Sequence, residues 1–178
     1  TTLISGPTEL PDPDGVKVHR VRTAREMLAA AQDALPADIA VCAAAVADWR
    51  VAKPQATKIK KGGAAPVLEL VENPDILAIL AASGPDRPGL VVGFAAETKT
   101  DPDALVAIAA DKRKSKACDW IIANDVSPGS GTFGGDHNAV HLVTESGAEF
   151  WGSLEKVQVA ERLVARIASH MIALAGAA

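Results

Sequence analysis

"GLVVGFAAETKTDPDALVAIAADKRKSKACDWIIAN", residues 89–124, decides the fold class, because it contains a strand, a helix and a second strand in succession. Residues 89–97 and 119–124 are apolar runs of strand length. Between them, Asp101 and Pro102 begin a helix, since Asp is a favoured N-cap and Pro suits the first helical position. This succession predicts parallel strands joined by a right-handed crossover.

Upstream of this stretch, strands and helices continue to alternate. Thr23 and Glu26 form a capping box for a helix that Pro36 ends. Asn73 and Pro74 are expected as the N-cap and the first residue of another helix. Apolar strands are expected at residues 2–5, 38–46 and 67–72, and the proline-rich residues 6–15 exclude regular structure.

Downstream, the sequence predicts an antiparallel hairpin and a long helix. Residues 139–144 and 148–152 form the hairpin strands. The last helix runs from Ser153 to about Leu174. Its expected apolar face consists of Val157, Ala160, Val164, Ile167, Met171 and Leu174. We therefore expect an α/β fold of three layers, with a mostly parallel sheet and an antiparallel hairpin at one edge.

Composition and charge limit the classes of function. A chain of 178 residues that is 48% hydrophobic predicts one globular domain, and a net charge of -4 argues against a nucleic-acid partner. The longest apolar run, residues 39–47, is about half of the roughly 20 residues that a membrane span needs. Cys42 and Cys118 suggest a reducing compartment, so we expect a cytoplasmic protein. Thr1 is interpreted as an internal start that truncates the domain.

Small or short polar residues follow three of the expected strands, in "AAAVADW", "GFAAET" and "IIANDVS". Ligands of parallel α/β sheets lie beyond such carboxyl ends. Asp48 is placed there to hold a metal ion or a ribose hydroxyl, or else it merely begins a turn. The loop from Asp48 to Pro66 is long enough to be a lid.

Two groups of lysines are candidates for binding an anion. The lid contains Lys53, Lys58, Lys60 and Lys61, which either bind phosphate groups or are simply solvated. Lys112 and Lys116 share one helix face, although cations at a helix end also complement its dipole. His137 and His141 are four residues apart, but in a strand this spacing makes no metal site. Hydrolase, P-loop, zinc-protease and standard dinucleotide motifs are absent from the sequence.

Several short motifs together resemble bacterial phosphopantothenoylcysteine synthetase. They are "AAAVADWR", "KIKK", "NPDIL", "GFAAET", "ANDVS", and the Phe and Asn of "TFGGDHNAVHLV", in the family's order and spacing. The resemblance implies a Rossmann-like three-layer α/β/α fold. It also implies a cytoplasmic ligase of coenzyme A biosynthesis that joins 4'-phosphopantothenate to L-cysteine, using CTP and Mg²⁺ or another divalent cation. The implied partners are a second copy in a homodimer and an N-terminal flavin-dependent phosphopantothenoylcysteine decarboxylase domain.

The resemblance also implies roles for individual residues. Lys58 is the expected catalytic lysine of the flap, and Asp48 is expected near the ribose or the metal-bound triphosphate. The nucleotide-binding residues are expected to be Ala44, Ala45, Asp48, Lys58, Phe94, Ala95, Lys112, Lys116, Asn124 and Asp125. Asn73 is interpreted as mainly a helix cap, and Glu97 has no role. For the homodimer, Phe150 and Trp151 offer an apolar edge, unless the last helix covers it.

The sequence departs from the family at its start. The family has a strand, a Gly/Ser-rich phosphate-binding loop and a helix before the segment that matches "TLISGP", and the loop holds an Asn that handles the acyl-cytidylate. We therefore keep two alternatives to a complete ligase. One is a nucleotide-binding module that does not complete the reaction. The other is an NAD-type oxidoreductase, which the missing glycine motif disfavours.

Overall fold

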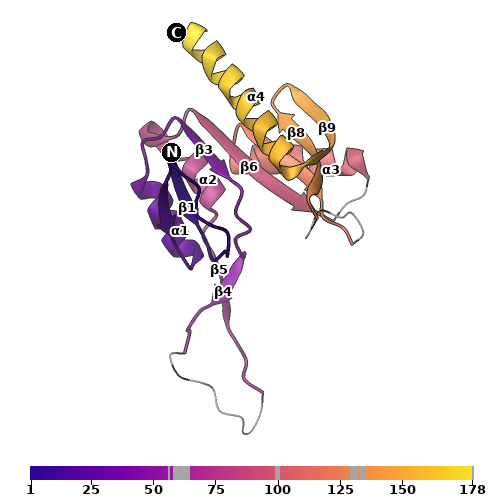
Figure 1. Cartoon of the computed structure of the whole chain (residues 1–178). Coiled ribbons are helices and arrows are strands. Elements are labelled where there is room, and N and C mark those ends of the chain that lie inside the picture. The colour runs from indigo at the N-terminus through magenta and orange to yellow at the C-terminus, as the bar shows by residue number, and fades with distance from the viewer. Residues whose placement is uncertain (56, 58–64, 99–100, 129–131, 133–134, 178) are drawn as a thin grey trace. The chain divides into compact units, whose positions relative to one another are not determined.

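The computed structural model describes residues 1–55, 57, 65–98, 101–128, 132 and 135–177. The chain divides into two compact units, Thr1–Gly89 and Leu90–Ala178. We call them unit 1 and unit 2 and describe each by itself (Figure 1). Unit 1 contains β1 (Thr2–Ser5), β2 (Lys17–Arg20), α1 (Ala24–Asp33), β3 (Ile39–Cys42), β4 (Trp49–Val51), β5 (Leu70–Glu72), α2 (Ile76–Ala81) and the 3-10 helix η1 (Gly84–Asp86). Unit 2 contains β6 (Leu90–Glu97), α3 (Pro102–Lys116), β7 (Trp120–Asp125), β8 (His137–Thr144), β9 (Gly147–Glu155) and α4 (Lys156–Ala177).

In unit 1, strands β1 and β2 form a parallel pair, and α1 packs with α2. The capping box at the start of α1 is confirmed: the Thr23 hydroxyl accepts from the Glu26 N–H, and the Glu26 carboxylate accepts from the Thr23 N–H. Ala31, Ile76 and Leu80 form a small apolar cluster between the two helices. Strand β2 was not expected from the sequence, because its four residues alternate too briefly to stand out from the preceding turn.

The start of α2 corrects the sequence interpretation. Asp75, not Asn73, is the N-cap, and its carboxylate accepts a hydrogen bond from the Ala78 N–H at 3.1 Å. Both residue types are good N-caps, so the sequence alone did not distinguish the two positions. Asn73 is thereby free for another role.

Three expected boundaries in unit 1 were also wrong. The strand expected at residues 38–46 is limited to Ile39–Cys42. The stretch from Asp48 to Pro66 is not loop throughout, because Trp49–Val51 forms β4, which pairs antiparallel with β5. The strand expected at residues 67–72 is limited to Leu70–Glu72. Together β4 and β5 make the stem of an arm (Figure 1). Val67, Leu68 and Leu70 are more than half exposed, so burial of apolar side chains does not favour a longer strand before Leu70.

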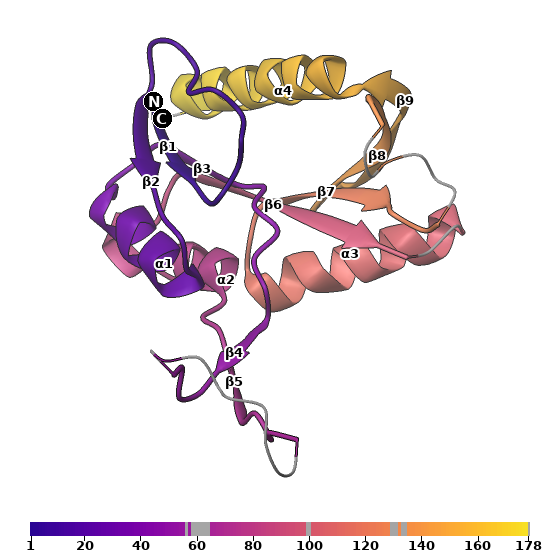
Figure 2. The ribbon, with the colours of Figure 1, turned by 60° about the horizontal axis from the view of Figure 1, so that its bottom comes forward.

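Unit 2 contains a sheet in the order β6–β7–β8–β9. Strands β6 and β7 are parallel, as the opening stretch predicts, whereas β8 and β9 form the expected antiparallel hairpin. Helices α3 and α4 lie on opposite faces of this sheet (Figure 2). The Trp120 ring contacts His170 of α4 with centroids 5.1 Å apart, which fixes the α4 face. The α/β class and the hairpin are therefore confirmed.

A β-bulge in the hairpin lies next to Phe150 and Trp151, the residues of the expected apolar edge. Between the pairs Ala139–Ser153 and His141–Phe150 the register shifts by one residue, and Gly152 adopts a positive φ of 79°. Trp151 is 4% exposed and lies under the Arg162 guanidinium of α4, whereas Phe150 is 60% exposed. The last helix therefore covers Trp151, which is the alternative that the sequence left open, and Phe150 stays exposed.

Helix α4 begins at Lys156 and not at Ser153, and of its expected apolar face Ile167 is confirmed as buried whereas other positions differ. The buried side chains are Val159, Leu163 and Ile167, while Val157 and Val164 are about two-thirds exposed. Apolar residues occur on more than one side of α4, so periodicity did not identify the inner face. Among the described residues, no helix combines the length and the apolar character that crossing a membrane requires.

Candidate functional site

In unit 1, the candidate site residues lie in the segment that follows β3. Ala44, Ala45 and Asp48 are all exposed, and the segment between β3 and β4 has no regular structure. Within it, the Val46 N–H donates to the Ala44 carbonyl at 3.1 Å. Because alanine side chains are small, backbone groups of this segment are open to a ligand.

Asn73 holds this segment from the other side of the arm. Its side-chain Nδ2 donates to the Ala47 carbonyl at 2.8 Å, and its backbone N–H donates to the Asp48 carbonyl at 2.7 Å. The structure thus brings the motifs "AAAVADWR" and "NPDIL" into direct contact. Sequence reasoning missed this contact, because nothing in either motif indicates which carbonyl the amide reaches.

In unit 2, the candidate residues lie at the carboxyl ends of β6 and β7. Parallel pairing places Ala96 beside Asn124 and Glu97 beside Asp125. Successive side chains alternate between the faces of a sheet. Phe94 and Asn124 therefore share the α4 face, whereas Ala95 and Asp125 share the α3 face. The candidates lie at one edge of the sheet but do not all lie on one face.

Burial differs among these residues. Ala95 is 1% exposed and Asn124 is 6% exposed, so a ligand would reach them mainly through the strand ends. Phe94 is half-buried. Asp125 is tied into the following turn, where its carboxylate accepts from the Ser127 N–H at 2.7 Å and from the Ser127 hydroxyl. The Thr132 hydroxyl donates to the Asp125 carbonyl at 2.8 Å.

Glu97, which had no role in the sequence interpretation, faces Lys112 of α3. The Lys112 Nζ lies 2.5 Å from the Glu97 Oε1, and the Glu97 side chain is 20% exposed. That oxygen makes no aligned hydrogen bond, so the contact is an ion pair. The pair holds one candidate lysine at the end of β6. One feature of the sequence could have indicated this ion pair. Glu97 lies in a strand, on the side of the sheet that α3 covers, and α3 ends in several cationic residues.

Of the other lysines expected to bind the nucleotide, only Lys116 lies among the described residues. Lys116 is half-buried at the end of α3, four residues after Lys112. Lys58 lies outside the described residues, as do Lys60 and Lys61. The catalytic role of Lys58 stays a prediction.

The described residues contain no group of three or more His, Cys, Asp or Glu side chains that could hold a metal ion. Mg²⁺ commonly binds through one or two carboxylates and the phosphates of a substrate, and the exposed carboxylate of Asp48 fits that mode. Burial, with the Asp75 carboxylate second, raises the pKa of the Cys42 thiol. Cys42 is therefore a protonated thiol at neutral pH and a poor nucleophile.

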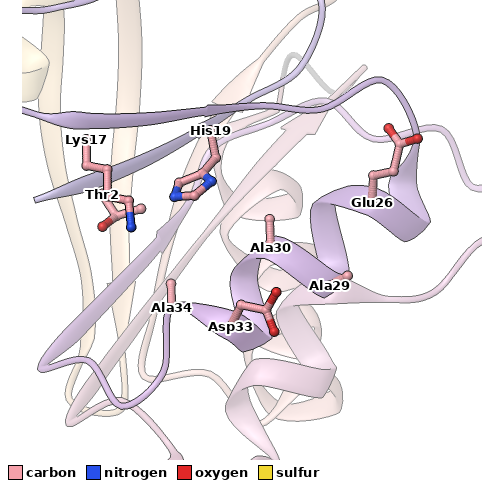
Figure 3. Close-up of a pocket in the computed structure, with 8 residues that line it drawn as sticks. All are labelled: Thr2, Lys17, His19, Glu26, Ala29, Ala30, Asp33 and Ala34. Carbon is pink, nitrogen blue, oxygen red and sulfur yellow. The ribbon is translucent and has the colours of Figure 1, made fainter.

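A separate hollow of ≈ 380 Å³ lies in unit 1, between the β1–β2 pair and α1 (Figure 3). Lys17 and His19 line one side, and Asp33 and Glu26 line the other. The Glu26 carboxylate already accepts from the backbone N–H groups of the α1 cap. None of the expected site residues lines this hollow, so it is distinct from the candidate site.

Residues 1–171 match the family described as the DNA/pantothenate metabolism flavoprotein C-terminal domain. The chain belongs to this family. Among the relatives of this flavoprotein C-terminal domain, the "Coenzyme A biosynthesis bifunctional protein CoaBC" of Escherichia coli K12 is 43% identical over 165 residues, which cover 90% of this chain and 38% of the relative. The protein of the same name from Mycobacterium tuberculosis H37Rv is 39% identical over 155 residues, which cover 83% of this chain and 37% of the relative.

Solved structures of the same flavoprotein domain confirm the Rossmann-like fold class. The crystal structure of the C-terminal domain of CoaBC has a TM-score of 0.72 at 28% identity, covering 96% of this chain and 75% of that chain. The DNA/pantothenate metabolism flavoprotein from Streptococcus pneumoniae has a TM-score of 0.76 at 20% identity, covering 95% of this chain and 80% of that chain, and supports the fold alone. The chain spans about two fifths of the length of the curated relatives it matches.

Proposed function

We propose that this chain is the ligase portion of an enzyme that joins 4'-phosphopantothenate to L-cysteine at the expense of CTP. The observation that carries the proposal is the family match over residues 1–171, together with 43% identity to a bifunctional protein of coenzyme A biosynthesis. The motifs that suggested the ligase lie within this matched region. A nucleotide-binding module without complete catalysis is the alternative.

The chemistry explains which residue types such a site needs. A carboxylate is a poor acceptor for an amine, so the phosphopantothenate carboxylate first attacks the α-phosphorus of CTP. The bond to the β-phosphate breaks, and an acyl-cytidylate and pyrophosphate form. The cysteine amine then attacks the acyl carbon and expels CMP. Both reactants of the first step are anions, so positive charge is needed to stabilise their approach and the transition state. No side-chain nucleophile is required, which agrees with the protonated state of Cys42.

Each candidate residue receives a role in this proposal. Ala44 and Ala45 offer backbone groups to the nucleotide, and Asp48 serves the ribose or the metal-bound triphosphate. Phe94 and Ala95 border the nucleotide, whereas Asn124 and Asp125 help to read the base. Lys58, Lys112 and Lys116 meet the phosphate groups.

A divalent cation and further partners belong to the proposal as well. When bound, Mg²⁺ would neutralise phosphate charge, and Asp48 would hold it together with the nucleotide. The word "bifunctional" in the relatives' name supports a second enzymatic part, which we propose to be the flavin-dependent decarboxylase. We also propose a homodimer and a cytoplasmic location. Cys42 and Cys118 are not joined in a disulfide bond, which is consistent with a reducing compartment.

The test is pyrophosphate release by the natural full-length protein, measured with and without CTP, phosphopantothenate and Mg²⁺. We expect release to require all three and to be lost in Lys58→Ala. In Lys112→Met, the KM for CTP is expected to rise roughly tenfold or more, since hydrogen bonds to charged groups are stronger than neutral ones. Lys114→Met removes an exposed cation from the same helix and serves as the matched control.

Several outcomes would contradict the ligase. CTP binding without pyrophosphate release would favour the binding module. Normal turnover in Lys58→Ala would remove the flap lysine from the mechanism. Equal KM changes in Lys112→Met and Lys114→Met would mean that Lys112 acts only through general charge. Thermal stabilisation by NAD but not by CTP would favour an oxidoreductase.

A further inference from the structure

We propose that Asn73 is a positioning residue that sets the backbone of residues 44–48 for binding the cytidine nucleotide. This inference rests on the proposed function, which assigns Ala44, Ala45 and Asp48 to the nucleotide. Asn73 itself is not proposed to touch the substrate. It acts through the carbonyl groups of Ala47 and Asp48.

Two hydrogen bonds from one residue fix two consecutive peptide groups. The Asn73 Nδ2 lies 2.8 Å from the Ala47 oxygen, and the Asn73 backbone nitrogen lies 2.7 Å from the Asp48 oxygen. Both distances are within the usual range for N–H···O hydrogen bonds. The Ala47 carbonyl belongs to the peptide group that carries the Asp48 N–H, and the Asp48 carbonyl belongs to the next one, so the two hydrogen bonds restrain the backbone on both sides of the Asp48 Cα. The side chain of Asp48 therefore starts from a restrained backbone.

Arg50 fixes which way the Asn73 amide points. Its Nη1 donates to the Glu72 carbonyl and lies 3.4 Å from the Asn73 Oδ1. A guanidinium group only donates hydrogen bonds, so the amide oxygen faces Arg50 and the amide NH₂ faces Ala47. The assignment of the amide oxygen and nitrogen thus follows from both partners. Arg50 also pairs with Val71 across the β4–β5 stem, which anchors its backbone.

The exposure of the segment explains why such a restraint matters. Val46 packs against the small apolar cluster, but Ala44, Ala45 and Asp48 are exposed, so packing of their own side chains contributes little to holding them. A ligand that binds a loose segment must order it, and that ordering reduces affinity. Asn73 removes part of this loss in advance. A capping role for Asn73 is excluded, because Asp75 caps α2.

The experiment measures steady-state kinetics of Asn73→Ala in the natural full-length protein. We expect the KM for CTP to rise about fivefold, the effect of losing one solvent-exposed hydrogen bond, while kcat changes by less than about twofold. The KM for cysteine stays unchanged, because the amine enters after CTP has reacted. Arg50→Met is the second variant and is expected to raise the KM for CTP in the same direction by a smaller factor.

A second readout needs no substrate. Hydrogen exchange of the peptide spanning residues 44–50 is expected to be faster in Asn73→Ala than in the wild type. Thr23→Ala is the matched control, because it removes the N-cap of α1 in the same unit and lowers thermal stability without contacting this segment. Its KM for CTP and its exchange at residues 44–50 are expected to equal those of the wild type.

The outcomes separate this inference from the proposed function. If the wild type forms no product from CTP, the ligase proposal fails, and hydrogen exchange alone decides whether Asn73 positions the segment. An unchanged KM for CTP with unchanged exchange in Asn73→Ala overturns the inference. A lower melting temperature with reduced kcat at constant KM, as a purely structural role predicts, overturns it too. If Asn73→Ala does not fold, the same criteria apply to Arg50→Met.

Discussion

Units 1 and 2 hold their candidate residues by different means. In unit 2, the strands that carry these residues are buried: Leu90, Val91 and Val92 of β6 are 0% exposed. In unit 1, Val41 of β3 is 47% exposed, and the residues that follow β3 are exposed except Val46, which is half-buried against the small apolar cluster. Packing fixes the strands that carry the candidates in unit 2, whereas hydrogen bonds from Asn73 and the packing of Val46 together restrain the segment in unit 1.

The difference in burial between the two units determines how much stability a substitution in each unit removes. A buried strand loses both transfer free energy and packing contacts when a side chain is truncated, whereas an exposed strand loses little of either. A hydrogen-bonded segment responds instead to removal of one donor. Core substitutions should therefore affect unit 2 most, and polar substitutions at Asn73 should affect unit 1 without a large loss of stability.

The largest expected effect compares two strand leucines. Leu142 in β8 is 1% exposed and Leu70 in β5 is 53% exposed. We expect Leu142→Ala to lower the free energy of unfolding by about 3 kcal/mol, and Leu70→Ala to lower it by less than about 1 kcal/mol. Urea unfolding followed by circular dichroism measures both. Similar losses in the two variants would mean that the strands of the two units are equally buried in solution.

The same contrast explains how well each unit could be predicted. In the opening stretch, the apolar runs of β6 and β7 and the cap at Asp101 all indicate the same structure, and the structure confirms all three. In unit 1, Asn73 and Asp75 competed as caps, and Val67 and Leu68 resembled strand residues although they are exposed. Local pattern is informative where burial decides the structure, and it is less informative where single hydrogen bonds decide it.

The candidate site could be predicted only in part for a related reason. Motif order indicated Asp48, Lys112 and the strand ends, because residue type and position suffice for that inference. The partners of Glu97 and Asn73 depend on tertiary contacts with α3 and with the arm. Two residues that are 15 or 26 positions apart in sequence show no pairing signal without the fold.

A smaller loss of stability is expected when the N-cap of a helix is removed, and each unit contains such a cap. Thr23 caps α1 in unit 1, and Asp101 caps α3 in unit 2 by accepting from the Ala104 N–H at 2.8 Å. Substituting either residue with Ala is expected to cost about 1 kcal/mol of stability. Thr23→Ser and Asp101→Asn keep a capping oxygen and are the matched controls. A loss confined to one unit would mean that the surroundings, and not the cap, determine the cost.

The smallest expected effect is the change of stability with pH, which should differ between the two units. Burial lowers the pKa of His141 in β8 below its usual value of 6.5, and its ring lies 4.7 Å from that of Phe150. The unfolded chain therefore binds a proton at His141 more readily than the folded chain does. The stability that neutral His141 contributes is complete above its usual pKa and is lost as the pH falls through the lowered pKa of the folded state. In unit 1, the Arg22 backbone N–H lowers the pKa of the Glu26 carboxyl. The stability that ionised Glu26 contributes is therefore lost only when the pH falls below its usual pKa of 4.5.

Hydrogen exchange between about pH 7.5 and pH 5.5, corrected for the intrinsic rates, can follow each unit separately. We expect peptides of β8 and β9 to lose protection on acidification, whereas peptides of α1 do not. His141→Gln removes the titrating group and should abolish the loss. If the loss persists in His141→Gln, another group of unit 2 titrates in this range. Because the His141 ring is only partly buried, the loss should remain smaller than that of either cap substitution.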